Sequence, residues 1–108
     1  MIDGAGRASL ELDLAERSSI AEYVGPEAPM FCTSSAMGQV GAAASLVQTI
    51  ALAELLRRKM LPPIAGLRHV VDGPLRLLTK HEPTSARSAI GISTGAPGLV
   101  GIVRVEIP

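Results

Sequence analysis

The pattern of apolar and polar positions predicts a long helix in the middle of the chain. Residues 41–58 are rich in Ala and Leu and apolar on nearly every side. Helices of this kind are buried, so we expect this one to lie inside a layered fold, covered on both sides. The basic residues 57–59 close it, where positive charge is favourable at the negative end of the helix dipole. Such a run is typical of a solvated helix end, and a contact patch is the alternative.

A second helix is predicted over residues 14–24. Asp13 can cap it, and Gly25 and Pro26 end it. Its apolar residues recur at helical spacing, while its charged residues are expected to face water. The apolar residues are Leu14, Ile20, Ala21 and Val24, and the charged ones are Glu16, Arg17 and Glu22.

The remaining apolar segments have the length and composition of strands. Residues 29–33 predict a buried strand and residues 75–79 a short one. Residues 88–93 and 99–107 predict two more around the Gly-rich turn 94–98, and in the last of them apolar and charged residues alternate. The order helix, strand, helix and then strands predicts an α/β layered fold.

Length, charge and cysteine content narrow the class of protein. The 108 residues suffice for a single domain, and 47% hydrophobic residues argue against disorder. Ten basic and ten acidic residues cancel, which leaves no electrostatic footprint for nucleic acid or anionic lipid. The one cysteine, Cys32, excludes an internal disulfide and suits a reducing cytosol. No signal peptide is visible, and the longest apolar run is too short and too polar to span a bilayer, so we expect a soluble, cytoplasmic protein with no membrane contact.

Three segments carry a resemblance to a known family. Residues 34–45 read Ser-Ser-Ala-Met-Gly-Gln-Val-Gly-Ala-Ala-Ala-Ser and lead into the long helix and on to Pro62-Pro63. Residues 4–9 read Gly-Ala-Gly-Arg-Ala-Ser, and residues 91–98 form a Gly-rich segment before the last strand. In order and spacing they resemble the Lys-x-x-x-Gly-His-x-x-Ala-Ala-x-Gly, Ala-His-Gly-Thr-x-Thr and Ser-Phe-Gly-Phe-Gly-Gly-Thr-Asn segments of β-ketoacyl synthases, the condensing enzymes of fatty-acid and polyketide assembly.

The resemblance covers residues 1–108 as the C-terminal part of the family's second half. It implies a thiolase-like layered half-domain, with a mixed sheet packed by helices. The N-terminal half, which carries the nucleophilic Cys in that family, has no counterpart in these residues. No cofactor is implied.

The catalytic positions of the family are occupied by other residue types. In β-ketoacyl synthases, two His residues stabilise the enolate that forms when the malonyl group loses carbon dioxide, and a Lys supports one of the two His residues. The matching positions here are Ala5, Gln39 and, for the Lys, Ser34. Ala5 has no polar side-chain atom, and the Gln39 amide cannot carry a proton at neutral pH. The three replacements together remove the acid–base set, so the resemblance implies no catalytic residue.

Other residues offer little alternative chemistry. Cys32 lies in an apolar segment and is expected to be an inert, buried thiol. His69 and His81 have no further ligand at metal-binding spacing, which favours surface histidines and no metal site.

Two further features remain as weak candidates. The hydroxyls of residues 33–35 have no His base near them in sequence. The Gly38-x-x-Gly41 turn before the long helix could hold an anion or serve an active site through its backbone.

The resemblance implies a non-catalytic ketosynthase-like subunit or domain of fatty-acid or polyketide assembly, similar to chain-length-factor subunits. The alternative is the C-terminal fragment of a β-ketoacyl-ACP synthase, an acyltransferase, whose nucleophile-bearing half lies elsewhere. A binding module unrelated to acyl chemistry is a third possibility. Expected partners are a second copy, meeting edge to edge near residues 30–33, or a ketosynthase, with acyl carrier protein as a further candidate.

Overall fold

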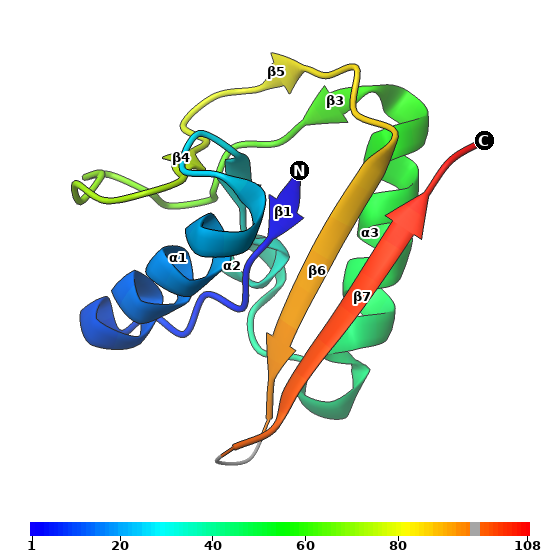
Figure 1. The fold of residues 1–108 in the computed structure, drawn as a ribbon. Helices are drawn as coiled ribbons and strands as arrows, with labels where there is room; N and C mark the ends of the chain where they lie inside the picture. The colour runs from blue at the N-terminus through cyan, green and yellow to red at the C-terminus, as the bar shows by residue number, and fades with distance from the viewer. Residues whose placement is uncertain (96–97) are drawn as a thin grey trace.

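A five-stranded mixed sheet forms the centre of the computed structural model, which describes residues 1–95 and 98–108 (Figure 1). Its strand order is β4-β2-β1-β6-β7, and β3 and β5 form a separate antiparallel pair. The strands β4, β2, β1 and β6 run parallel to their neighbours, whereas β7 runs antiparallel to β6 at the edge. The bounds are β1 Ile2–Asp3, β2 Pro29–Phe31, β3 Met60–Leu61, β4 Arg76–Leu77, β5 Glu82–Pro83, β6 Ser88–Thr94 and β7 Val100–Glu106.

Helices cover both faces of this sheet, so the predicted α/β fold with a mixed sheet packed by helices is confirmed. The helices are α1 Leu10–Val24, α2 Thr33–Met37 and α3 Ala44–Arg58, and a 3-10 turn, η1 Gly41–Ala43, precedes α3. Neighbouring residues of a strand point to opposite faces. Met30 of β2 therefore packs with Ile20 of α1, while the next residue, Phe31, belongs to the cluster of α3.

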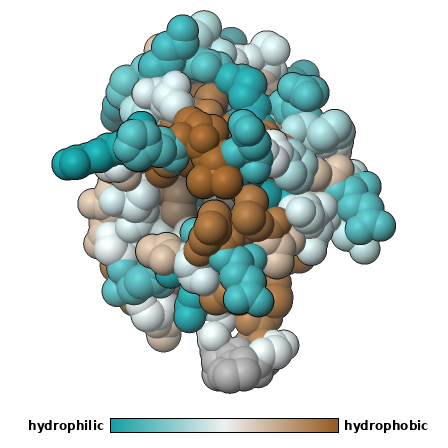
Figure 2. All heavy atoms as spheres, turned by 90° about the vertical axis from the view of Figure 1, so that its left-hand side faces the viewer, coloured by the Kyte–Doolittle hydropathy of each residue, from teal (hydrophilic) through white to brown (hydrophobic). Residues whose placement is uncertain are grey.

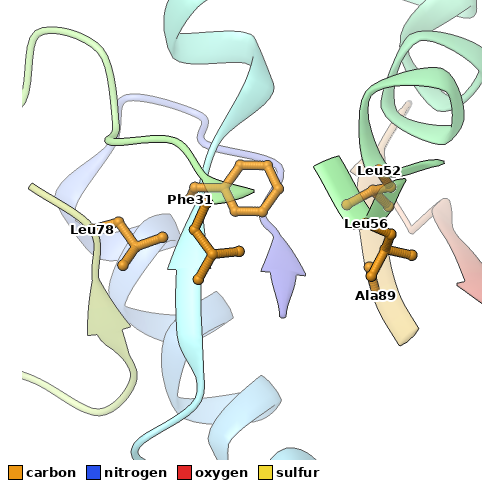
Figure 3. Packing of buried hydrophobic residues seen from close by; sticks show 6 residues of the cluster. Phe31, Leu52, Leu56, Leu78 and Ala89 are labelled. Atoms are coloured by element: carbon orange, nitrogen blue, oxygen red, sulfur yellow. The ribbon is translucent and has the colours of Figure 1, made fainter. Parts of the chain in front are cut away.

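The larger of the two apolar clusters lies between the sheet and α3. Leu52 and Leu56 of α3 lie next to Ala89 of β6, and Phe31 lies beside Leu78 (Figure 3). A large side chain at position 91 of β6 would collide with Leu52, since a Cβ there would come within 3.1 Å of its Cδ1. Gly91 therefore lets α3 approach the sheet closely.

The long helix is confirmed, but its expected cover on both sides is wrong for the described residues. The buried residues of α3 are Gln48, Leu52 and Leu56, which form one stripe at a spacing of four. Leu46 and Ile50 are 63% and 62% exposed. The reason is that most of the packing against this helix comes from β6 and β7, so the side that carries Leu46 and Ile50 is left open to solvent.

The first helix begins earlier than predicted. It starts at Leu10, because Ser9 takes the extended N-cap conformation and the Asp13 N–H already bonds to the Ser9 carbonyl. The Asp13 carboxylate does not cap the helix and instead accepts a hydrogen bond from the Arg7 N–H at 2.9 Å. The predicted end at Gly25 is confirmed, where φ is 95°.

Two charged residues of α1 do not face water as expected, although Glu22 does. The Arg17 side chain is buried, and its guanidinium donates to the carbonyl oxygens of Val71 and Pro74 at 2.9 and 2.8 Å. Glu16 is half-buried and accepts a hydrogen bond from the Ala5 N–H at 2.7 Å. Arg17 is buried because the loop before β4 folds over this helix, and Glu16 is half-buried because the loop of residues 4–6 lies against it.

The four predicted strands are confirmed as β2, β4, β6 and β7, with bounds that differ by up to two residues. The turn predicted at 94–98 includes residues 96–97, which lie outside the described residues. The expected contact between copies near residues 30–33 is wrong, because β2 lies between β1 and β4 and has no free backbone edge. Across the described ranges, no helix has the length and apolar character needed to cross a bilayer.

Candidate functional site

Three segments that are distant in sequence meet at one edge of the sheet. The strands β1, β2 and β6 run parallel, so their carboxyl ends lie at the same edge. Residues 4–6 follow β1, residues 32–39 follow β2, and Thr94 ends β6. The three segments that resemble a β-ketoacyl synthase are therefore neighbours in the fold. For the third segment, this statement excludes residues 96–97, which lie outside the described residues.

The three family positions lie side by side at this edge. The Ser34 hydroxyl donates a hydrogen bond to the Ala5 carbonyl at 3.1 Å. The Gln39 amide nitrogen donates to the Gly6 carbonyl at 3.4 Å. Ala5, Ser34 and Gln39 also line one small hollow of about 30 Å³, which is enough for a few water molecules. The polar groups at two of these positions therefore bind backbone, and the hollow is too small for an acyl chain.

The thiol of Cys32 lies beside this cluster. Its Sγ is 2.9 Å from the Ser34 hydroxyl and 3.4 Å from the Gly4 carbonyl oxygen. Burial raises the pKa of the Cys32 thiol, and hydrogen bonds from the Ser34 side chain and the Ser35 backbone offset this only in part. A raised pKa leaves little thiolate at neutral pH, which agrees with the expected inert thiol. The thiol is half-buried rather than fully enclosed.

Gly6 makes the close approach of these segments possible. Its φ is +54°, and a Cβ at this position would lie 2.1 Å from the Cys32 Sγ. Only glycine satisfies both the left-handed backbone and the lack of space. The loop at residues 4–6 can therefore lie directly against the segment that follows β2.

One buried and one half-buried carboxyl group hold this edge together, and sequence reasoning missed both roles. Asp3 is fully buried and accepts hydrogen bonds from the Thr33 N–H at 2.7 Å and from the Thr33 hydroxyl. Burial raises the pKa of Asp3 and also that of Glu16, which binds the Ala5 N–H. A two-residue strand such as β1 leaves no periodic signal, so nothing in the sequence marks Asp3 as buried.

Gln48 is a further polar residue that the sequence did not single out. It lies on the buried stripe of α3, is 7% exposed and lines the hollow. Its amide nitrogen donates to the Ile92 carbonyl at 2.9 Å, and its amide oxygen has no hydrogen-bond partner among the described residues. The amide links α3 to the end of β6, which orders the floor of the hollow.

The other candidate residues do not join this site. His69 and His81 are exposed, and the described part of the chain holds no group of three His, Cys, Asp or Glu residues close enough to bind a metal ion. Of the three hydroxyls considered, those of Thr33 and Ser34 are bound as above, and Ser35 bonds to the Cys32 carbonyl. None of them has a histidine base among its hydrogen-bond partners.

The Gly38-x-x-Gly41 turn does not open α3 directly. Gly41 begins the 3-10 turn, and α3 starts at Ala44. The Gly38 N–H already bonds to the Ser34 carbonyl, and the Ala43 N–H to the Val40 carbonyl. The N–H groups of Gly38 and Ala43 are therefore engaged, and the anion site at this turn stays a prediction.

A much larger groove lies on the opposite face of the sheet. It has a volume of about 780 Å³ and runs between α1 and the open face of β6 and β7. Figure 2 shows this side of the molecule, with apolar side chains gathered in a band down its middle. Apolar residues from both walls dominate the lining, namely Leu12, Ile20, Val24, Ile90, Ile92 and Ile102.

No protein-family model and no curated protein sequence matches the chain, so comparison with known proteins does not assign a role to this site.

Proposed function

We propose that the chain is a non-catalytic, ketosynthase-like subunit or domain that acts with a partner in fatty-acid or polyketide chain assembly. The observation that carries the proposal is the meeting of Ala5, Ser34 and Gln39 at one edge of the sheet. These residues stand where the family holds its catalytic His and Lys residues. Their convergence is what the resemblance requires, since the family's catalytic residues must also lie close together.

The same site supports a role without catalysis. Decarboxylative condensation needs a thiolate and charged or proton-carrying groups beside it. Ala5, Ser34 and Gln39 provide neither, and burial raises the pKa of Cys32. The hollow of about 30 Å³ leaves no room for a thioester substrate. The close packing of the three segments and the absence of acid–base groups at Ala5, Ser34 and Gln39 together favour a structural role beside an active partner.

The open side of α3 favours a partner that covers it. Leu46 and Ile50 are the exposed apolar residues of a helix whose opposite stripe is already buried on the sheet. Large apolar side chains that gather on one face of a helix are typical of an interaction surface. This observation also fits the alternative, a C-terminal fragment of a β-ketoacyl-ACP synthase that is completed by a nucleophile-bearing half. We place the partner contact of either assembly on this side of α3.

Reconstitution tests the proposal and separates it from the alternative. The chain is mixed with a separately produced, nucleophile-bearing half of a β-ketoacyl synthase, or with an intact β-ketoacyl synthase. We expect a complex in light scattering that Leu46→Lys weakens, and no release of carbon dioxide from malonyl-acyl carrier protein by the chain alone. Condensation that appears only when both halves are mixed favours the fragment. Absence of any complex with either protein contradicts both readings and leaves an unrelated binding module.

A further inference from the structure

The outer edge of β7 is a free strand edge with apolar side chains beside it. β7 pairs with β6 on one side, and no described residue pairs with its other side (Figure 1). It is seven residues long, whereas β4 at the opposite edge of the sheet has two. Long apolar edge strands readily pair with another chain unless they are blunted. The described part of β7 has no proline and no covering helix on this edge.

The pairing with β6 fixes which backbone groups of β7 remain free. The Ile107 N–H bonds to the Arg87 carbonyl, and the Gly95 N–H bonds to the Leu99 carbonyl. Hydrogen-bonded pairs alternate along an antiparallel ladder, so positions 101, 103 and 105 also bond to β6. The N–H and carbonyl groups of positions 100, 102, 104 and 106 consequently point outward from the sheet.

The side chains of these same positions lie on the groove side of the sheet. Val103 and Val105 pack toward α3, so the alternate residues point the other way. Val100 and Ile102 line the groove and are 64% and 71% exposed. Free backbone groups and exposed apolar side chains thus coincide on one edge.

From this coincidence we infer that β7 is the contact through which two copies of this chain form a dimer. An antiparallel edge is self-complementary about a two-fold axis, because each copy offers the donors that the other accepts. The net formal charge of zero adds no repulsion between copies. The inference does not rest on the proposed function, which concerns the far face of the molecule.

The side chains favour a register centred on Ile102 over one centred on Arg104. If the two-fold axis of the dimer passes beside Ile102, the two Ile102 side chains lie opposite each other. Val100 of each copy then lies opposite Arg104 of the other copy. Centring the axis on Arg104 would oppose two like charges, which is unfavourable. In the Ile102 register each Arg104 keeps its ion pair with Glu106 of the same chain, and its aliphatic stem covers Val100 of the second copy.

Pairing in this register also joins the two grooves. Residues directly opposite each other in an antiparallel pair point to the same face of the sheet. The grooves of about 780 Å³ therefore meet along the two β7 strands and form one apolar trough, with an α1 helix along each outer side. The dimer buries the most exposed part of each groove, around Ile102.

The test compares Ile102→Lys with Leu46→Lys across a protein concentration series in sedimentation or light scattering. Both residues are exposed, so neither substitution is expected to unfold the chain, which circular dichroism checks. We expect the original chain and Leu46→Lys to have twice the mass of one chain, and Ile102→Lys to have the mass of one. A chain that stays monomeric at every concentration overturns the inference, as does an Ile102→Lys variant that remains a dimer.

Amide hydrogen exchange gives an independent measurement on the same samples. The N–H groups of Ile102 and Arg104 point outward and should be protected in the dimer of the original chain. The Arg104 N–H should exchange at least about tenfold more slowly in the original chain than in Ile102→Lys. The Val103 N–H, which faces β6, should be protected in both. Equal exchange at Arg104 in the two proteins contradicts pairing through this edge even when a dimer is present.

Discussion

The Ser34 hydroxyl donates a hydrogen bond to the carbonyl oxygen of Ala5 over 3.1 Å. This bond joins two positions that carry a Lys and a His in β-ketoacyl synthases, the family that the chain resembles. Neither residue can hold a charge or transfer a proton at neutral pH. The contact keeps the two segments together while the groups that would support decarboxylation are absent.

The first prediction is that the chain alone neither condenses nor loads acyl groups. Incubation with acyl and malonyl thioesters of acyl carrier protein should release no carbon dioxide and leave no acyl group on Cys32. The physical reason is the raised pKa of the thiol, for which burial is the main cause, so little thiolate exists at neutral pH. Mass spectrometry of the intact chain measures the loading directly. Steady acyl extension that Cys32→Ala abolishes would falsify this prediction.

The second prediction concerns the two sides of α3. Leu52 is fully buried, so Leu52→Ala should lower the free energy of unfolding by about 2–5 kcal/mol through lost burial and a residual cavity. The matched control is Leu46→Ala on the exposed side of the same helix, which should change it by no more than about 0.5 kcal/mol. Urea unfolding followed by circular dichroism measures both. Equal effects of the two substitutions contradict the burial pattern described for this helix.

Local pattern was sufficient to predict most elements of the fold. The long helix, the helix that ends at Gly25 and the strands β2, β4, β6 and β7 each lie in a segment that shows a period or a bounded apolar run, including the two-residue β4, which lies within residues 75–79. The two-residue strands β1, β3 and β5 have no such signal. Since β1 lies between β2 and β6, the strand that joins the two parts of the sheet was the one that the sequence could not reveal.

Long-range contacts account for what the sequence misjudged. Arg17 is charged and lies in a helix, so exposure was the expected state, yet a loop more than fifty residues away folds over it. The apolar character of α3 indicated burial on both sides, but an exposed apolar side and a buried one look alike in sequence. The three family positions were identified from the resemblance, whereas Asp3, Glu16 and Gln48 became visible only once the parallel strands had brought their segments together.

The third prediction is that the Arg17 guanidinium stabilises the loop before β4. It donates to the carbonyl groups of Val71, Pro74 and Leu75, and Leu75 has an unfavourable positive φ of 68°. Arg17→Lys keeps the charge but loses the planar fork that reaches several acceptors at once. We expect a loss of about 2–4 kcal/mol in the free energy of unfolding, since each hydrogen bond to a charged group contributes about 1.5–3 kcal/mol.

The control for this prediction is Arg57→Lys, because Arg57 is exposed and, among the described residues, its ion pair is with Glu54 of its own helix. Its effect should be within about 1 kcal/mol, as for other surface ion pairs. Denaturant unfolding gives the comparison, and amide exchange at residues 71–75 locates it. A stable Arg17→Lys variant with unchanged exchange in this loop would show that the guanidinium contacts do not hold it.

The fourth prediction is a pH dependence of stability that Glu16 causes. Burial is the main reason that the pKa of Glu16 is raised above its ordinary value of 4.5, and the negative charges of Asp13 and Asp3 raise it further. The folded chain therefore holds this proton more tightly than the unfolded chain does. Above pH 4.5 unfolding releases a proton, so the contribution of Glu16 to stability falls as pH rises through the raised pKa and is constant beyond it.

Glu16→Gln tests this dependence, because a glutamine has nearly the same shape and its amide oxygen can still accept the Ala5 N–H. The free energy of unfolding of both proteins is measured by urea titration from pH 4 to pH 8. The difference between them should favour Glu16→Gln increasingly as pH rises, and then become constant, while other titrating groups cancel in the difference. Glu22→Gln is the control, since it makes the same substitution at an exposed position of the same helix. A difference between Glu16→Gln and the original chain that is flat over the whole range, or that has the opposite slope, contradicts the burial of this carboxyl group beside the residues 4–6 loop.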